Sequence, residues 1–150
     1  MQTGSLYQYV MIMKKTIVVI EDHTLIRELW VKIYNEKGDI EVVGDSGDFE
    51  EGIELVEKLQ PDIVSLDINL NDASGFDAVP LIKEYSPNSR ILVVSMHIQL
   101  NYLKQMMELG VMGYVTKSSS HTELFKAIDE IMEGRIYVCA EMQKFFQNDL

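Results

Sequence analysis

Five short apolar runs, each followed by a segment of helical period, constrain the fold of this chain more than any other feature. The runs span residues 16–20, 40–44, 61–66 (with Pro61 outside the strand), 90–94 and 113–115. Such runs, rich in Val and Ile, are typical of strands buried on both faces of a sheet. Because right-handed crossovers place helices on both sides of a parallel sheet, the alternation predicts a doubly wound α/β domain with five parallel strands.

The segments between the runs have the spacing and end signals of helices. We predict helices over residues 23–37, 48–59, 75–85 and 98–109, and a fifth between Ser120 and Gly134. In the first helix, Leu25, Leu29 and Ile33 lie four residues apart and predict its apolar face. Two helices begin with a polar residue and a Glu three positions later, the spacing of a capping box: Asp48–Glu51 and Ser120–Glu123.

Composition excludes several classes of protein. The net charge is -11, and nucleic-acid binding depends on Lys and Arg that neutralise phosphates, so we expect no direct contact with nucleic acid. No apolar run approaches the roughly 20 residues of a membrane helix, so we expect no membrane contact. A single cysteine, Cys139, excludes an internal disulfide and fits a reducing compartment. We expect a cytoplasmic protein.

The chain divides into three parts. Residues 1–12 show no clean period and precede a natural start at Met13, so we interpret them as a leader of cloning origin. Residues 13–136 hold all the predicted strands and helices and form the domain. Residues 137–150 are interpreted as a C-terminal tail or the start of a linker.

Polar side chains follow the predicted strands at the point where each strand ends. Glu21 and Asp22 follow the first, Asp67 and Asn69 the third, Ser95 the fourth and Lys117 the fifth. In an open α/β sheet, ligands bind at the carboxyl ends of the strands. If the strand order is 2-1-3-4-5, the three acids cluster at this edge.

Clustered carboxylates repel one another, so a hard cation is expected between them. Mg²⁺ fits best because it takes oxygen ligands and is often completed by a phosphate. Lys117 and the Ser95 hydroxyl can bind phosphoryl oxygens. Asp67 ends a central strand alone and is the candidate nucleophile, and Gly75 permits a tight approach in its loop.

These residues lie in four short motifs, "VVIEDH", "SLDINL", "VVSMH" and "GYVTKS". Together, in this order and spacing, they resemble the response-regulator receiver domain of two-component signalling. The resemblance covers residues 15–134, nearly the whole chain. The end of the chain is similar to receivers of the NarL/FixJ (LuxR-type) subfamily, which implies the flavodoxin-like receiver fold with strand order 2-1-3-4-5.

The resemblance implies a role for each motif residue. Asp67 would accept a phosphoryl group from the phosphohistidine of a sensor histidine kinase. Asp22 would bind Mg²⁺ directly, Glu21 through water, and the Asn69 backbone carbonyl would be a further ligand beside Asp67. Mn²⁺ can replace Mg²⁺ in such a site.

The remaining motif residues would bind or respond to the phosphoryl group. Ser95 and Lys117 would contact its oxygens, and Ser95 with Tyr114 would form the switch, the inward turn of Tyr114 accompanying activation. Asn69 and His97 lie where the family varies the lifetime of the phosphoryl group.

The sequence departs from the family pattern at two positions. Asn71 replaces the usual proline of the acceptor loop, so we expect this loop to be more mobile, and Ser118 replaces a proline after Lys117. Neither change removes a chemical group that the mechanism needs.

The implied function is a phosphorylation-activated signalling switch. Phosphorylation would shift the surface of the fourth helix and fifth strand and drive homodimer formation. The output would be transcription, through a helix-turn-helix domain absent from this chain. The implied protein is no enzyme beyond its own phosphorylation and dephosphorylation. The residues after Gly134 are too few for a DNA-binding domain, so either this is a single-domain regulator or the chain has been cut.

Two other functions are weighed against this one. An Asp-nucleophile phosphatase or phosphotransferase dependent on Mg²⁺ would need a substrate pocket and a second acid, but the loops are short and Asn69 occupies the neighbouring position. A pseudo-receiver that acts only as an interaction module would need a broken set of acids, and here every acid is present.

Overall fold

The computed structural model describes residues 14–70 and 73–148, and its centre is a parallel sheet of order β2-β1-β3-β6-β7-β8. The strands are β1 (Lys15–Ile20), β2 (Ile40–Ser46), β3 (Ile63–Leu66), β6 (Arg90–Ser95), β7 (Gly113–Thr116) and β8 (Tyr137–Val138). The predicted fold and the order of the first five strands are confirmed. β8 adds a sixth strand, parallel to β7, that was not predicted. The predicted leader, residues 1–12, and Asn71 lie outside the described residues.

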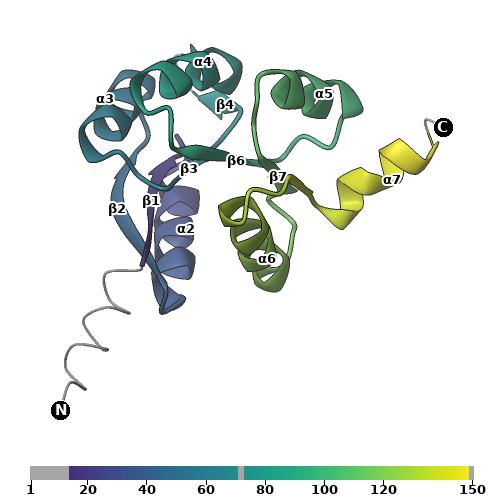
Figure 1. The fold of residues 1–150 in the computed structure, drawn as a ribbon, viewed down its shortest axis with the longest axis horizontal. Helices are drawn as coiled ribbons and strands as arrows, with labels where there is room; N and C mark the ends of the chain where they lie inside the picture. The colour runs from purple at the N-terminus through teal and green to yellow at the C-terminus, as the bar shows by residue number, and fades with distance from the viewer. Residues whose placement is uncertain (1–13, 71–72, 149–150) are drawn as a thin grey trace.

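Helices cover both faces of the sheet (Figure 1). They are α2 (Thr24–Glu36), α3 (Phe49–Leu59), α4 (Gly75–Tyr85), α5 (Leu100–Glu108), α6 (His121–Met132) and α7 (Ala140–Asn148). In Figure 1, α3, α4 and α5 lie on one side of the sheet and α2 and α6 on the other, with α7 beyond the edge that β8 forms. The acceptor loop contains a small antiparallel pair, β4 (Asn69–Leu70) and β5 (Ala73–Ser74). None of the described helices has the length and apolar character of a membrane span.

The central strands are buried as their composition predicts. All four residues of β3 are buried, as are Ile17–Ile20 of β1 and Ile91–Ser95 of β6. Helices on both faces remove these strands from water, so their β-branched side chains need no polar alternation.

The apolar face predicted for the first helix is partly wrong. Leu25 is 78% exposed and Leu29 is 48% exposed, whereas Ile33 is buried. Trp30 and Tyr34 are buried beside Ile33, and their rings stack with centroids 6.3 Å apart. The side of α2 that carries the two large aromatic rings is therefore the side that packs on the sheet. Both leucines lie on the opposite, exposed side.

The predicted N-caps form, but neither glutamate closes its capping box, and the Asp48 N–H donates to the Ser46 hydroxyl instead. Asp48 accepts a hydrogen bond from the backbone N–H of Glu51, and Ser120 accepts one from that of Glu123. The Glu123 carboxylate instead accepts hydrogen bonds from the Tyr137 hydroxyl and the Ala140 N–H, each at 2.9 Å. Glu123 therefore holds β8 and the start of α7 against α6.

Candidate functional site

The backbone places the predicted site residues at one edge of the sheet. Parallel pairing continues just past the strands: the Asp67 N–H donates to the Ile20 carbonyl at 3.0 Å, and the Lys117 N–H donates to the Ser95 carbonyl at 2.8 Å. The side chains that follow β1, β3, β6 and β7 therefore meet at the carboxyl ends of these strands, as expected for an open α/β sheet.

Lys117 bridges two buried carboxylates at this edge. Its Nζ lies 2.5 Å from Oε1 of Glu21 and 3.4 Å from Oδ2 of Asp67. Both acids are almost completely buried, so each would be unstable as an unpaired ion. One ammonium between two carboxylates leaves a net negative charge, which Asp22 increases.

The charge surplus suits a divalent cation. Burial, together with a hydrogen bond and the charge from Glu21, raises the pKa of Asp22 above its ordinary value. Carboxylate oxygens of Glu21 and Asp22 and a ring nitrogen of His23 lie within 4.8 Å of one another. The two acids and Asp67 offer the oxygen donors that Mg²⁺ prefers. His23, which follows the acids directly, was not predicted as a member of this group.

Ser95 and Tyr114 lie near the acids, but both side chains form hydrogen bonds to the backbone of His97. The Ser95 Oγ accepts from the His97 N–H at 3.0 Å, and it lies beside the Tyr114 side chain. The Tyr114 hydroxyl donates to the His97 carbonyl at 3.0 Å, and burial raises the pKa of Tyr114 to about 12. Within the described residues no hydrogen bond joins Ser95 to Asp67.

Asn69 and His97 meet above the acceptor position. The Nδ2 of Asn69 lies 2.5 Å from Nε2 of His97, and the His97 ring packs on Tyr102 with centroids 4.6 Å apart. Both residues line a pocket of about 260 Å³ over Asp67. The other lining residues are Asp22, His23, Met96 and Lys117.

Gly75 allows the acceptor loop to pass close to α4. A Cβ at this position would lie 2.6 Å from the Asp67 carbonyl oxygen and 2.8 Å from the Ile68 Cα. Backbone atoms cannot yield at such distances, so only glycine fits. The tight approach predicted for Gly75 is observed.

Two contacts near the site were not predicted. Arg27 donates to the Glu21 carbonyl at 2.8 Å and forms an ion pair with Asp45 at 3.2 Å. Its place one turn into the helix after the acids was an available signal. Oε2 of Glu141 lies within 3.1 Å of the hydroxyls of Thr116 and Ser118, which flank Lys117. No sequence signal connects Glu141 to this loop.

Comparison with known proteins agrees with this geometry. Residues 17–129 match the model of the response regulator receiver domain family. The chain is 36% identical over 126 residues to the transcriptional regulatory protein DegU of Brevibacillus brevis, covering 83% of this chain and 53% of DegU. It is 31% identical over 121 residues to the nitrate/nitrite response regulator protein NarL of Escherichia coli K12, covering 81% and 56% of the two chains.

A solved structure shows the same similarity to response regulators. A two-component response regulator of the LuxR family from Aurantimonas sp. SI85-9A1 superposes with a TM-score of 0.86 at 29% identity, covering 91% of this chain and 97% of that one. The chain spans about half the length of the curated relatives it matches.

Proposed function

The chain belongs to the response regulator receiver domain family, and we propose that it is a phosphorylation-activated switch whose phospho-acceptor is Asp67. The observation that carries this proposal is the Lys117 ammonium held between Glu21 and Asp67. When a phosphoryl group is added to Asp67, the Lys117 ammonium can move from the carboxylates to a phosphoryl oxygen. The relatives of the chain are named as transcriptional and response regulators, which supports a signalling role over enzymatic turnover.

The proposed reaction is a phosphoryl transfer from the phosphohistidine of a sensor kinase. A carboxylate oxygen of Asp67 attacks phosphorus while the bond from phosphorus to the imidazole nitrogen breaks, which gives an acyl phosphate on Asp67. Mg²⁺, when bound by Asp22, Asp67, Glu21 and the Asn69 carbonyl, would offset the charge of the phosphoryl oxygens. Lys117 then pairs with one of these oxygens.

The proposed switch rearranges the hydrogen bonds of Ser95. A phosphoryl group replaces the single charge of the Asp67 carboxylate with about two negative charges and offers three strong acceptors. The Ser95 hydroxyl would donate to one of them, and its present bond from the His97 N–H, next to the His97 carbonyl that holds Tyr114, would change. Because Tyr114 lies on β7 next to α5, the surface of α5 and β7 would carry the signal to a homodimer partner or an output domain.

The surroundings of the pocket suit contact with a protein donor. Leu25 and Met96 are highly exposed and line a hollow with Lys117, and the exposed Ile98 lines another with Met96 and Lys117. We propose that these three apolar side chains, Leu25, Met96 and Ile98, contact the sensor kinase in the cytoplasm. The relatives' names support transcription as the output, through a DNA-binding domain outside this chain.

The test is acyl phosphate formation from a small donor. Incubation with Mg²⁺ and acetyl phosphate should add one phosphoryl group, detected by intact mass and located on Asp67 by peptide mapping. Hydroxylamine should remove it, because an acyl phosphate is an activated carboxyl. Leaving out Mg²⁺ should suppress labelling, and Asp67→Ala should abolish it.

A matched variant controls for loss of structure. Asp77→Asn alters another aspartate, in the first turn of α4, and should be labelled like the wild type. Label that persists in Asp67→Ala, or no label on the wild type, would refute the assignment. Sustained hydrolysis of a phosphate monoester would favour the phosphatase alternative instead.

A further inference from the structure

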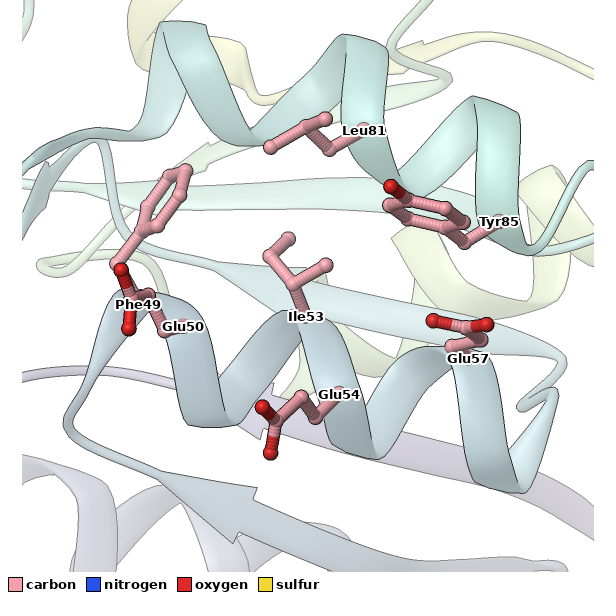
Figure 2. Close-up of a pocket in the computed structure, with 7 residues that line it drawn as sticks. All are labelled: Phe49, Glu50, Ile53, Glu54, Glu57, Leu81 and Tyr85. Atoms are coloured by element: carbon pink, nitrogen blue, oxygen red, sulfur yellow. The ribbon is translucent and has the colours of Figure 1, made fainter.

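A second hollow lies between α3 and α4, away from the phosphorylation pocket. Its volume is about 350 Å³, larger than the roughly 260 Å³ pocket over Asp67. Figure 2 shows Phe49 and Ile53 of α3 facing Leu81 and Tyr85 of α4 across it. We call this hollow the α3/α4 groove. The phosphoryl chemistry uses none of its lining residues.

The floor of the groove is apolar and pre-formed. Ile53 is buried, whereas Tyr85 is 40% exposed although it is a large aromatic residue. The Gln60 side chain, just after α3, donates to the Tyr85 carbonyl at 2.9 Å and joins the ends of the two helices. A partner would therefore bury apolar surface without first having to order the groove.

The α3 side of the groove is acidic. Glu50, Glu54 and Glu57 line it and are four and three residues apart, so they share one face of the helix (Figure 2). Like charges at this spacing weaken a helix. In the part of the chain that the structure describes, no Lys, Arg or His forms an ion pair with any of the three. Glu50 lies in the first turn of α3 and Lys58 lies four residues after Glu54, so the helix tolerates the row, which still places three carboxylates beside the groove.

We propose that the α3/α4 groove binds a basic, amphipathic helix of a partner protein. Apolar side chains of this helix would cover Phe49, Leu81 and Tyr85. Lys or Arg residues four and three positions apart would pair with the glutamates, which span two turns, about 10 Å. Nucleic acid and anionic membranes are repelled by this row. A second copy of the chain would bring the same three carboxylates and be repelled as well.

The probe is a synthetic 18-residue helical peptide with a Leu stripe and Lys at the i, i+4 and i+7 positions beside it. A scrambled peptide of the same composition is its control. Titration into ¹⁵N-labelled protein should shift amide resonances of α3 and α4 and leave those around Asp67 in place. The affinity should fall at least tenfold between 50 and 300 mM NaCl, because the row is exposed.

Two triple variants with the same change in net charge separate the groove from general attraction. Glu50→Gln/Glu54→Gln/Glu57→Gln should weaken binding of the helical peptide at least tenfold. Tyr85→Ser should also weaken it, because this change removes an aromatic ring from the apolar surface of the groove. Glu36→Gln/Glu41→Gln/Glu133→Gln, at exposed sites elsewhere, should bind like the wild type. Acetyl phosphate should label all these variants normally, so failure here is distinct from failure of the proposed function.

Three results would overturn the proposal. They are equal weakening in both triple variants, equal binding of the scrambled peptide, and shifts that map outside α3 and α4.

Discussion

Asn69 and His97 line the same pocket as the carboxylate on which the proposed chemistry depends. Their side chains are 2.5 Å apart over Asp67, and the His97 ring is braced by Tyr102. Removing either side chain opens the path of water to an acyl phosphate. We expect His97→Ala to hydrolyse its phosphoryl group about three to ten times faster than the wild type, which is up to about 1.4 kcal/mol of barrier.

The decay of the label after removal of acetyl phosphate measures this effect. Because the two residues act as a pair, Asn69→Ala should have a similar effect, and the double variant should decay about as fast as either single variant. His121→Ala changes an exposed histidine at the start of α6 and should decay normally. Slower decay in His97→Ala would instead make His97 the base that activates water.

The members of the site could be predicted from the sequence, but their pairing could not. Glu21, Asp22, Asp67 and Lys117 follow strand ends, and parallel topology alone brings such residues to one edge. The direction of each side chain depends on rotamers and competing partners. Ser95 therefore accepts from the His97 N–H, and Glu141 reaches the Lys117 loop from far along the chain.

Helix α2 is held to the centre of the sheet by one buried hydrogen bond. The hydroxyls of Tyr34 and Ser65, on β3, are 2.8 Å apart, and both side chains are excluded from water. Tyr34→Phe leaves the Ser65 hydroxyl buried without a partner, so we expect the free energy of unfolding to fall by about 1–3 kcal/mol. Urea denaturation measures this change.

A double-mutant cycle separates the bond from the packing. Tyr34→Phe/Ser65→Ala removes both hydroxyls and should cost less than the sum of the two single variants. Tyr85→Phe, at a half-exposed tyrosine, should stay within about 0.5 kcal/mol of the wild type. Strict additivity in the cycle would show that the hydrogen bond contributes nothing.

The C-terminal helix α7 is fixed to the Lys117 loop through Glu141. Its carboxylate accepts from Thr116 Oγ at 2.9 Å and from Ser118 Oγ at 3.1 Å, and the neighbouring Cys139 is buried. We expect Glu141→Ala to weaken the docking of α7 by about 1–2 kcal/mol and to speed thiol labelling of Cys139 by about 5- to 30-fold.

Cys139 is the only cysteine in the chain, so the thiol reagent reports on this segment alone. Glu133→Ala removes an exposed acid just after α6 and should label at the wild-type rate. Unchanged labelling in Glu141→Ala would show that β8 and Met142 hold α7 without the carboxylate.

Elements with strong periodicity were predictable, and short or context-dependent ones were not. The runs at 16–20 and 90–94 are long enough to identify as buried strands, and Gly38 and Gly110 mark the ends of the helices after them. β8 has two residues, too few for any period, and it exists because β7 offers an open edge. The apolar face predicted from Leu25 and Leu29 was wrong because spacing alone does not show which face of α2 packs on the sheet. Trp30 and Tyr34 occupy that face.

At the scale of the whole molecule, the net negative charge and the burial of tyrosines both lower the stability of the fold as pH rises. The chain already carries a net charge of -11, so each further deprotonation adds repulsion to the folded state. Burial raises the pKa of Tyr114 to about 12 and that of Tyr34 further, whereas an unfolded tyrosine titrates near 10. The folded chain therefore keeps both protons in a pH range where the unfolded chain loses them.

This difference predicts alkaline unfolding with a definite sign. The contribution of both tyrosines to stability is complete below pH 10 and is lost as pH rises from about 10 through 12. By pH 11 the loss should be about 2–3 kcal/mol for the pair, since one pKa unit corresponds to about 1.4 kcal/mol. Urea denaturation between pH 8 and 11 in 0.5 M NaCl, which screens the general repulsion, measures it. Tyr114→Phe should reduce the loss, because Tyr114 is completely buried and its pKa is raised; a loss between pH 8 and 11 equal to that of the wild type would contradict the prediction.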